Sequence, residues 1–198
     1  MQSLRIGVLA DTHVPHRLPY LPPLVGRIFT GVDLILHAGD LDEPDVLAEL
    51  GSIAPTLAVR GNWHLRHQPT RSSPHLPAIV HLHLLGQHVV VTHGVWNLAY
   101  GAFLEFQARV LGHHERLNDL MIRSLQRRFP EADVVIFGHS HRAEARWVNG
   151  TLFVNPGAVC ETPDFELRPA VALLTVHTSG AEAEIVYLDE GIAHDFTG

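Results

Sequence analysis

The sequence predicts an α/β fold in a single domain covering residues 1–198. Short apolar runs rich in β-branched residues, which are typical of buried strands, alternate with segments whose apolar residues have helical spacing. Five of these runs lead directly into glycine, aspartate, histidine or asparagine, and α/β folds bind their ligands at the carboxyl ends of strands. The 198 residues, of which 46% are hydrophobic, suffice for one substantial core.

The expected elements follow one another without a linker, a repeat or a low-complexity tract. Residues 86–87 and 149–150 each separate two apolar runs, which predicts two hairpins, and the Asn-Gly pair at 149–150 is the strongest short turn signal. Residues 96–128 predict two helices with a break near residues 112–114. The predicted strands are 4–10, 33–38, 56–59, 79–85, 88–92, 134–137, 145–148, 151–154, 171–176 and 183–188, with short helices at 24–29 and 43–50.

Charge and hydropathy exclude several classes of protein. The net charge of −7 disfavours binding to polymeric nucleic acid, which requires a positive surface. Arg5 and Asp11 interrupt the first apolar run, so it is expected to be a strand rather than a signal peptide, and no run is long enough to span a membrane. The single cysteine, Cys160, excludes an internal disulfide and is expected to be inert. We therefore expect a cytoplasmic protein.

The polar residues after the predicted strands form a coherent set of metal ligands. Carboxylate, amide and imidazole donors suit manganese, iron, zinc or nickel rather than a metal that prefers thiolates. Seven ligands are too many for one tetrahedral ion but suffice for two ions if one carboxylate, naturally Asp40, bridges them. The seven candidates are Asp11, His13, Asp40, Asn62, His93, His139 and His141.

These residues resemble the five ordered motifs of the calcineurin-like metallophosphoesterases. The motifs are Asp11-x-His13, Gly39-Asp40, Gly61-Asn62, His93-Gly94 and Gly138-His139-Ser140-His141. Their order, each after a predicted strand, is a specific signal, and the resemblance extends from about residue 4 to the turn at 155–157. The branch that it resembles most is that of the small single-domain bacterial and archaeal phosphodiesterases.

The resemblance implies a sandwich of two mixed β-sheets flanked by helices, a four-layer architecture. It also implies that Asp11, His13, Asp40 and His141 hold one divalent ion and that Asp40, Asn62, His93 and His139 hold the other. Manganese is the first expectation for both ions. A metal-bridging hydroxide would then attack the phosphorus of a small phosphate ester in line, while Asn62 and the metals stabilise charge on the phosphoryl oxygens.

The chain departs from the family pattern in two places. Many members have a histidine, taken as the leaving-group acid, directly after the motif asparagine, whereas this chain has Trp63 followed by His64. His64 is either a displaced general acid or, the reading we favour slightly, a solvent-exposed loop residue. Residues 96–115 are expected to form a helical insertion. An apolar stripe in it (Phe103, Phe106, Val110 and Leu111) predicts a cap or an oligomer contact, with simple packing as the alternative.

The resulting hypothesis is a dinuclear-metal phosphodiesterase. The alternatives are a phosphomonoesterase acting on a nucleotide or phosphoprotein, and a catalytically idle scaffold like the retromer subunit that shares this fold. Histidines outside the motifs are expected to be structural: His37 in the core or behind the ligands, His81 and His83 facing solvent, and His113 and His114 in a surface turn. His16 and Arg142 adjoin motifs and are weaker candidates for phosphate contacts.

Overall fold

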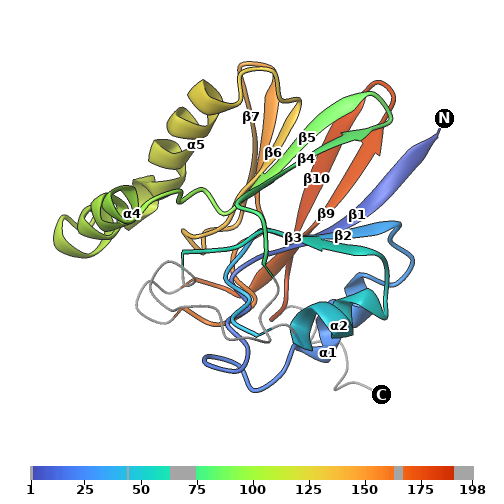
Figure 1. The fold of residues 1–198 in the computed structure, drawn as a ribbon, viewed down its shortest axis with the longest axis horizontal. Helices are drawn as coiled ribbons and strands as arrows, with labels where there is room; N and C mark the ends of the chain where they lie inside the picture. Colours follow the sequence, from blue (N-terminus) through green and yellow to red (C-terminus); the bar gives the residue numbers. More distant parts are fainter. Residues whose placement is uncertain (1, 44, 63–74, 163–166, 190–198) are drawn as a thin grey trace.

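The chain folds into two mixed five-stranded β-sheets, as the computed structural model in Figure 1 shows for residues 2–43, 45–62, 75–162 and 167–189. One sheet has the strand order β10-β9-β1-β2-β3 and the other the order β4-β5-β6-β8-β7. The strands are β1 (Ser3–Leu9), β2 (Leu34–His37), β3 (Thr56–Ala58), β4 (Ile79–Leu84), β5 (Gln87–Thr92), β6 (Val134–Ile136), β7 (Glu144–Val148), β8 (Thr151–Asn155), β9 (Ala170–His177) and β10 (Gly180–Tyr187).

Each sheet has parallel strands at its centre. In the first sheet β1 pairs in parallel with β2, and β2 with β3, whereas β9 and β10 run antiparallel. In the second sheet β6 pairs in parallel with both β5 and β8, and the outer strands β4 and β7 are antiparallel. The carboxyl ends of parallel strands meet at one edge of a sheet, so the loops after β1, β2, β3, β5 and β6 can gather there.

The core lies between the two sheets. Alternating residues of β1 (Ile6, Val8) contribute to the same buried cluster as Val89 and Val91 of β5 and Ile136 of β6. All five are at most 1% exposed. One side of each of these strands therefore lies in an interior that the two sheets share.

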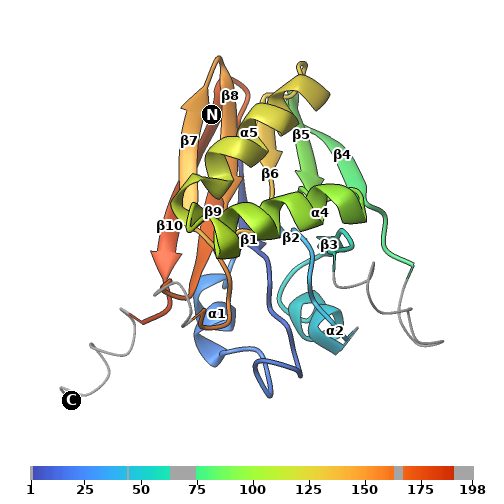
Figure 2. The ribbon, with the colours of Figure 1, turned by 90° about the vertical axis from the view of Figure 1, so that its left-hand side faces the viewer.

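Helices cover the two outer faces of the sandwich, which confirms the four-layer architecture. Helices α1 (Pro23–Ile28) and α2 (Asp45–Gly51) bury Val25 and Leu50 against the first sheet. Helices α4 (Leu98–Glu105) and α5 (Leu117–Arg128) pack Leu104 and Met121 on the second sheet. Figures 1 and 2 show the two pairs of helices on opposite sides of the paired sheets. Within the described residues, the structure contains no helix with the length and hydropathy of a membrane span.

Both predicted hairpins form, one of them with a shifted turn. Asn149 and Gly150 have φ values of 48° and 87°, so β7 and β8 join through the predicted Asn-Gly turn. In the other hairpin Leu84 pairs with Gln87, so the turn residues are Leu85 and Gly86 rather than the predicted 86–87. A two-residue turn of this kind requires positive φ at both positions, and Leu85 at 51° precedes Gly86 at 88°.

The segment between β5 and β6 is largely helical with a break where the sequence predicts one. After α4 the chain continues as a π-helical stretch (Phe106–Val110), and a 3₁₀ turn (His114–Arg116) leads into α5. Gly112, with φ of 65°, lies in the break. The side chains of the predicted apolar stripe are 45–67% exposed, so simple packing within this chain does not explain the stripe.

Candidate metal centre

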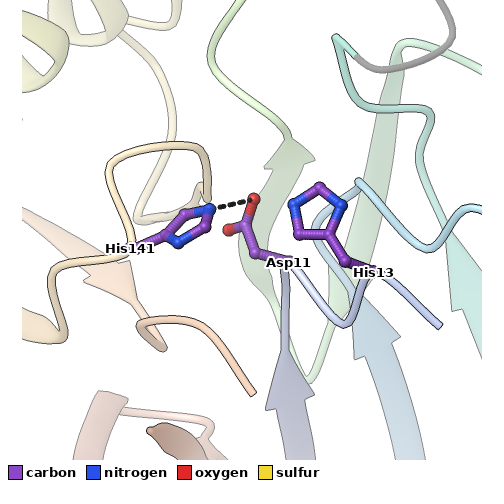
Figure 3. A group of neighbouring side chains, drawn as sticks. All are labelled: Asp11, His13 and His141. Carbon is purple, nitrogen blue, oxygen red and sulfur yellow. Dashed lines mark ion pairs between the residues drawn. The ribbon is translucent and has the colours of Figure 1, made fainter. Parts of the chain in front are cut away.

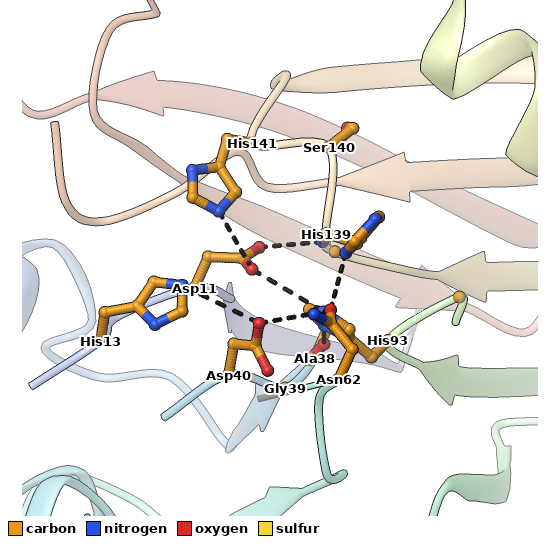
Figure 4. A network of polar contacts seen from close by, with 12 residues as sticks. Asp11, His13, Ala38, Gly39, Asp40, Asn62, His93, His139, Ser140 and His141 are labelled. Carbon is orange, nitrogen blue, oxygen red and sulfur yellow. Dashed lines mark hydrogen bonds and ion pairs between the residues drawn. The ribbon is translucent and has the colours of Figure 1, made fainter. Parts of the chain in front are cut away.

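Six of the seven predicted ligands come from loops that directly follow strands. Asp11 and His13 follow β1, Asp40 follows β2, His93 follows β5, and His139 and His141 follow β6. Asn62 follows β3 after a few more residues. Figure 4 shows all seven side chains directed toward one another from both sheets. The structure therefore brings every predicted ligand into one crevice.

The backbone of these loops has an unusual conformation. Eight described non-glycine residues have positive φ, and five of them are predicted ligands. The five are Asp11 (51°), His13 (48°), Asp40 (56°), His139 (73°) and His141 (59°). A left-handed backbone conformation costs free energy for residues other than glycine, so it persists only where the surrounding structure imposes it. Such residues are common at functional sites.

Asp11, His13 and His141 form the first group of possible ligands, shown in Figure 3. One ligand atom of each residue lies within 4.8 Å of the others. The His141 Nε2 atom is 3.4 Å from Asp11 Oδ1, and Asp11 itself is fully buried. A carboxylate oxygen and two imidazole nitrogens so close together suit a borderline divalent ion.

Asp11, Asp40 and His93 form the second group. The His93 Nε2 atom is 3.4 Å from Asp40 Oδ2 and 3.9 Å from Asp11 Oδ1. Asp40 Oδ2 also lies 3.9 Å from His13 Nε2, so it stands between histidines of both groups. Asp11 belongs to both groups as well. Asp11 and Asp40 therefore both lie close enough to the two groups to contribute ligands to two ions.

Asn62 and His139 complete the arrangement beside His93. The Asn62 Oδ1 atom accepts hydrogen bonds from His93 Nε2 at 2.8 Å and from His139 Nδ1 at 2.7 Å (Figure 4). The backbone N–H of His139 donates to Asp11 Oδ2 at 3.0 Å. His139 is thereby tied to both groups.

One atom of the site lacks a hydrogen-bond donor. Asp11 Oδ1 is buried, and no described residue donates a hydrogen bond to it. A buried carboxylate oxygen without a donor costs free energy unless a cation compensates its charge. The residues therefore fit a metal ion, which the Asp11 carboxylate would help to hold.

The ionisation of the site reflects these contacts. Burial opposes the charge of His93, but the Asp40 and Asp11 carboxylates raise its pKa to about 9. Burial and the neighbouring His93 lower the pKa of His139 to about 3. Although burial acts in the opposite direction, His141 and His93 hold the pKa of Asp11 below its usual value. Without metal, a proton on His93 thus supplies part of the positive charge that compensates the carboxylates.

Residues behind the ligands fix their orientation. His93 Nδ1 donates to the Ala38 carbonyl at 2.8 Å, which directs Nε2 to the carboxylates. His13 Nδ1 lies 3.2 Å from Asp42 Oδ1, and His141 Nδ1 lies 2.7 Å from Thr162 Oγ1. Such partners set the tautomer and ring orientation of metal-binding histidines. Asp42 and Thr162 are not among the residues predicted from the sequence, although Asp42 lies only two residues after Asp40 of the second motif.

A buried network of polar side chains also supports the histidine loop. Asn155 Nδ2 donates to the Gly138 carbonyl at 3.2 Å and to Ser140 Oγ at 2.9 Å. Ser140 Oγ donates to Asn118 Oδ1, and Asn118 Nδ2 donates to the Arg142 carbonyl. Residues of β8 and α5, distant in sequence, thus position the loop that carries His139 and His141. The sequence identified Asn155 only as a turn residue.

Two glycines permit the close approach of the loops. A Cβ atom at position 61 would collide with the Asp40 carboxylate, and one at position 39 would lie 2.7 Å from His93 Nδ1. Gly39 also has a φ of 100°, a backbone conformation that residues with a Cβ atom rarely adopt. These motif glycines therefore leave the space that Asp40 and His93 occupy.

Five of the seven predicted ligands line a cavity of about 960 Å³, namely His13, Asp40, Asn62, His139 and His141, whereas Asp11 and His93 are buried behind them. The cavity walls include Leu104, Ala108 and Arg109 from the α4 region and Arg17 from the loop after β1. His114 also lines the cavity and is 8% exposed, so the prediction that it lies in a surface turn is wrong. The side chain packs against the cavity because the 3₁₀ turn directs it inward toward Ser140 and His141. Burial, together with Arg142 and His141, lowers its pKa to about 4.

The other histidines named from the sequence have varied positions. His37 is fully buried, accepts from the Gly39 N–H, and lies 3.2 Å from Thr12 Oγ1, as expected for a core histidine. His16 Nδ1 is 3.0 Å from Asp42 Oδ2. Cys160 is buried, and burial raises its pKa to about 11, which agrees with an inert thiol. Trp63 and His64 lie outside the described residues.

Comparison with known proteins gives consistent results. Residues 4–179 match the family described as the calcineurin-like phosphoesterase superfamily domain. A probable metallophosphoesterase of Methanothermobacter thermautotrophicus is 32% identical over 182 residues, 91% of each chain. A probable metallophosphoesterase of Methanocaldococcus jannaschii is 28% identical over 79% of this chain and 68% of its own length.

Solved structures share the fold. Zinc-complexed Vps29 of Entamoeba histolytica superposes with a TM-score of 0.64 and 22% identity, covering 93% of this chain and 99% of its own. An archaeal phosphodiesterase superposes with a TM-score of 0.60 and 20% identity, covering 93% of this chain and 100% of its own.

Substitution of Asp42 by asparagine tests its role in orienting His13. Asp42→Asn keeps the shape of the side chain but removes the negative charge next to His13 Nδ1. We expect the dissociation constant for Mn²⁺ to rise roughly 10- to 100-fold, as is typical when the partner of a metal-binding histidine is lost. Isothermal titration calorimetry measures this. His16→Asn removes the other histidine of Asp42 and should change the constant little; equal effects of both variants would contradict the assignment.

The raised pKa of His93 predicts a pH-dependent metal affinity. The proton on His93 must leave before Nε2 can bind an ion, and at pH 7 the ring is protonated because its pKa is about 9. We expect Mn²⁺ affinity to rise about tenfold per pH unit between pH 7 and 9, then level off, since each unit deprotonates ten times more of the ring. Calorimetric titrations of metal-stripped protein measure this slope. Constant affinity across the range would show that His93 is neutral before metal binds.

Proposed function

Because the chain belongs to the calcineurin-like phosphoesterase superfamily, we propose that it is a metal-dependent phosphodiesterase acting on a small phosphate ester. The observation that carries this proposal is that seven residues with oxygen or nitrogen donors converge around the buried Asp11 carboxylate, and that five of them line a cavity. Metal-dependent hydrolysis of a phosphate ester requires both ligands that hold the ions and open space for the substrate beside them.

In this proposal the ligands hold two divalent ions. Asp11, His13, Asp40 and His141 bind one ion, and Asp40, Asn62, His93 and His139 bind the other, with Asp40 shared between them. The position of Asp40 Oδ2, 3.4 Å from His93 Nε2 and 3.9 Å from His13 Nε2, supports the shared role. We propose manganese for both ions, with iron, zinc or nickel as alternatives that the same donors accept. When bound, the ions would supply a hydroxide nucleophile near neutral pH and neutralise phosphoryl charge.

The side chains of the chain would position and stabilise the ester. Asn62 directs Oδ1 to the two histidines, so its amide N–H groups are available to donate to a phosphoryl oxygen. The Arg17 guanidinium, in the cavity wall on the His13 loop, places positive charge where the phosphate would lie. Donors prearranged around developing negative charge contribute substantially to phosphoryl transfer. His64 stays a candidate for the leaving-group acid.

The charges of the cavity favour a diester over a monoester. Arg17, Arg109 and Arg168 line it together with three carboxylates, Glu105, Glu161 and Asp189, in addition to Asp40. With the arginines balanced by carboxylates, a singly charged diester would meet less repulsion than a doubly charged monoester. The cavity of about 960 Å³ also has room for substituents on both sides of the phosphorus.

We propose that residues 96–115 are a helical insertion that caps the cavity. Leu104, Glu105, Ala108, Arg109 and His114, all from this segment, line the cavity wall. The apolar stripe of this segment is exposed, which supports a cap or an oligomer contact.

The scaffold alternative fits the site less well. A scaffold that has lost its metals is expected to have apolar replacements among the ligands, whereas all seven donors are present here. The left-handed backbone at five of them would have no compensating benefit without bound ions.

Hydrolysis of two model substrates tests the proposed function. With Mn²⁺ present, we expect faster turnover of bis-p-nitrophenyl phosphate than of p-nitrophenyl phosphate, because the cavity suits one negative charge. His139→Ala and metal-stripped protein should both lose turnover of the diester, since each removes part of the ion site. The spectrophotometric release of p-nitrophenol measures all of these rates.

The matched control is His177→Ala, which changes a histidine on β9 that pairs with Glu182 rather than with the site. It should keep the rate of the unchanged protein. Faster monoester hydrolysis would favour the phosphomonoesterase, and bound metal without turnover of either ester would favour the scaffold.

A further inference from the structure

A second group of histidines lies on the outer face of the hairpin formed by β4 and β5. His81 and His83 are exposed, as the sequence predicts, and their spacing of two residues places both on one face of β4. His88, on β5, pairs directly with His83 across the hairpin. Side chains of directly opposed residues in antiparallel strands lie close together. The three imidazoles therefore form one surface cluster, here called the hairpin histidines.

Two of these rings already have the geometry of neighbouring metal ligands. His81 Nδ1 is 3.0 Å from His88 Nε2. Two nitrogens bound tetrahedrally to one zinc ion, each at 2.0–2.1 Å, are separated by roughly 3.3 Å. Binding an ion between them requires only a small adjustment of two surface side chains.

The tautomer of His88 leaves a lone pair on Nε2, which binding of a metal ion requires. Its Nδ1 donates to the Glu131 carbonyl at 3.1 Å, because a carbonyl oxygen can only accept. In the neutral ring Nε2 is then the acceptor, and it receives the proton of His81 Nδ1. If His81 takes its other tautomer, with the ring proton on Nε2 instead of Nδ1, both facing nitrogens present lone pairs to a metal ion. A backbone carbonyl behind a histidine is the usual support for a metal-binding ring.

The third ring is within reach and its framework is rigid. The His83 ring stacks on His88 with 5.0 Å between centroids and 5° between planes. Binding through His83 as well would require this exposed side chain to rotate so that one of its nitrogens faces the other two rings. The backbone N–H of His88 donates to Asp133 Oδ2 at 2.7 Å, and the His81 ring contacts Phe129 edge-on at 5.8 Å. The hairpin is thereby attached to the segment that follows α5.

We propose that His81, His83 and His88 form a separate binding site for a borderline divalent metal ion such as Zn²⁺. Imidazole donors suit Zn²⁺, and three of them with one water complete a tetrahedral shell. The site is independent of the candidate metal centre. His88 and His93 are five residues apart along β5, a separation of roughly 17 Å at the rise of an antiparallel strand.

Equilibrium dialysis against micromolar Zn²⁺, followed by elemental analysis, tests the proposal. The double variant His81→Ala/His88→Ala should bind one Zn²⁺ fewer per chain than the unchanged protein. Because neither residue belongs to the candidate metal centre, Mn²⁺-dependent ester hydrolysis should stay the same within about twofold. His177→Ala is the control for loss of a surface histidine and should bind as much Zn²⁺ as the unchanged protein.

Two further measurements keep the outcome decisive. His81→Gln changes a single exposed residue and preserves folding if the double variant does not fold; it should weaken the additional Zn²⁺ site without changing the others. Equal Zn²⁺ content in the unchanged protein and in both variants would overturn the proposal. If the unchanged protein binds Zn²⁺ at the hairpin but hydrolyses neither ester, the result would count against the proposed function alone.

Discussion

The buried carboxylate of Asp11 is the charge on which the arrangement of the site depends. Asp11 is fully buried, and its Oδ1 atom receives no hydrogen bond from any described residue. An uncompensated carboxylate in a protein interior costs several kcal/mol or more, so positive charge must lie close to it. In the metal-free protein, the protonated ring of His93 supplies part of that charge. Divalent ions would supply it more completely and release the proton.

The β-sandwich makes this concentration of charge possible. The two sheets share an interior of fully buried aliphatic residues, and the stability of that core holds the loops at their edge in place. The loops accept left-handed backbone at five donor positions and omit side chains at Gly39 and Gly61. Asn155 and Asn118 then hold the histidine loop from beneath. The stability of the packed sheets thus offsets the free-energy cost of the unusual backbone conformation in the loops.

The parts of the structure that depend on local pattern could be predicted from the sequence. Strands, hairpins and the helical break follow from apolar periodicity and turn residues, and the ligands follow from polar residues at strand ends. The turn at Leu85 was shifted by one residue because leucine gives no sign of positive φ. The layer order came from resemblance to a family rather than from the pattern itself.

What the sequence did not predict depends on contacts between distant segments. Asp42, Thr162, Asn118 and Asn155 support ligands through hydrogen bonds over long sequence separations, which no local pattern encodes. His114 is predicted to lie in a surface turn, yet the 3₁₀ turn directs its side chain into the cavity. The hydrogen bond between His81 and His88 likewise depends on the register of the β4–β5 hairpin.

The most direct test of the proposed two-ion centre is a crystal structure grown with Mn²⁺, with anomalous scattering recorded near the manganese absorption edge. If two ions share the crevice between the sheets, two anomalous peaks should lie roughly 3.5–4 Å apart beside the Asp40 carboxylate. A single peak at the Asp11 carboxylate, or none in the crevice, would contradict the two-ion centre.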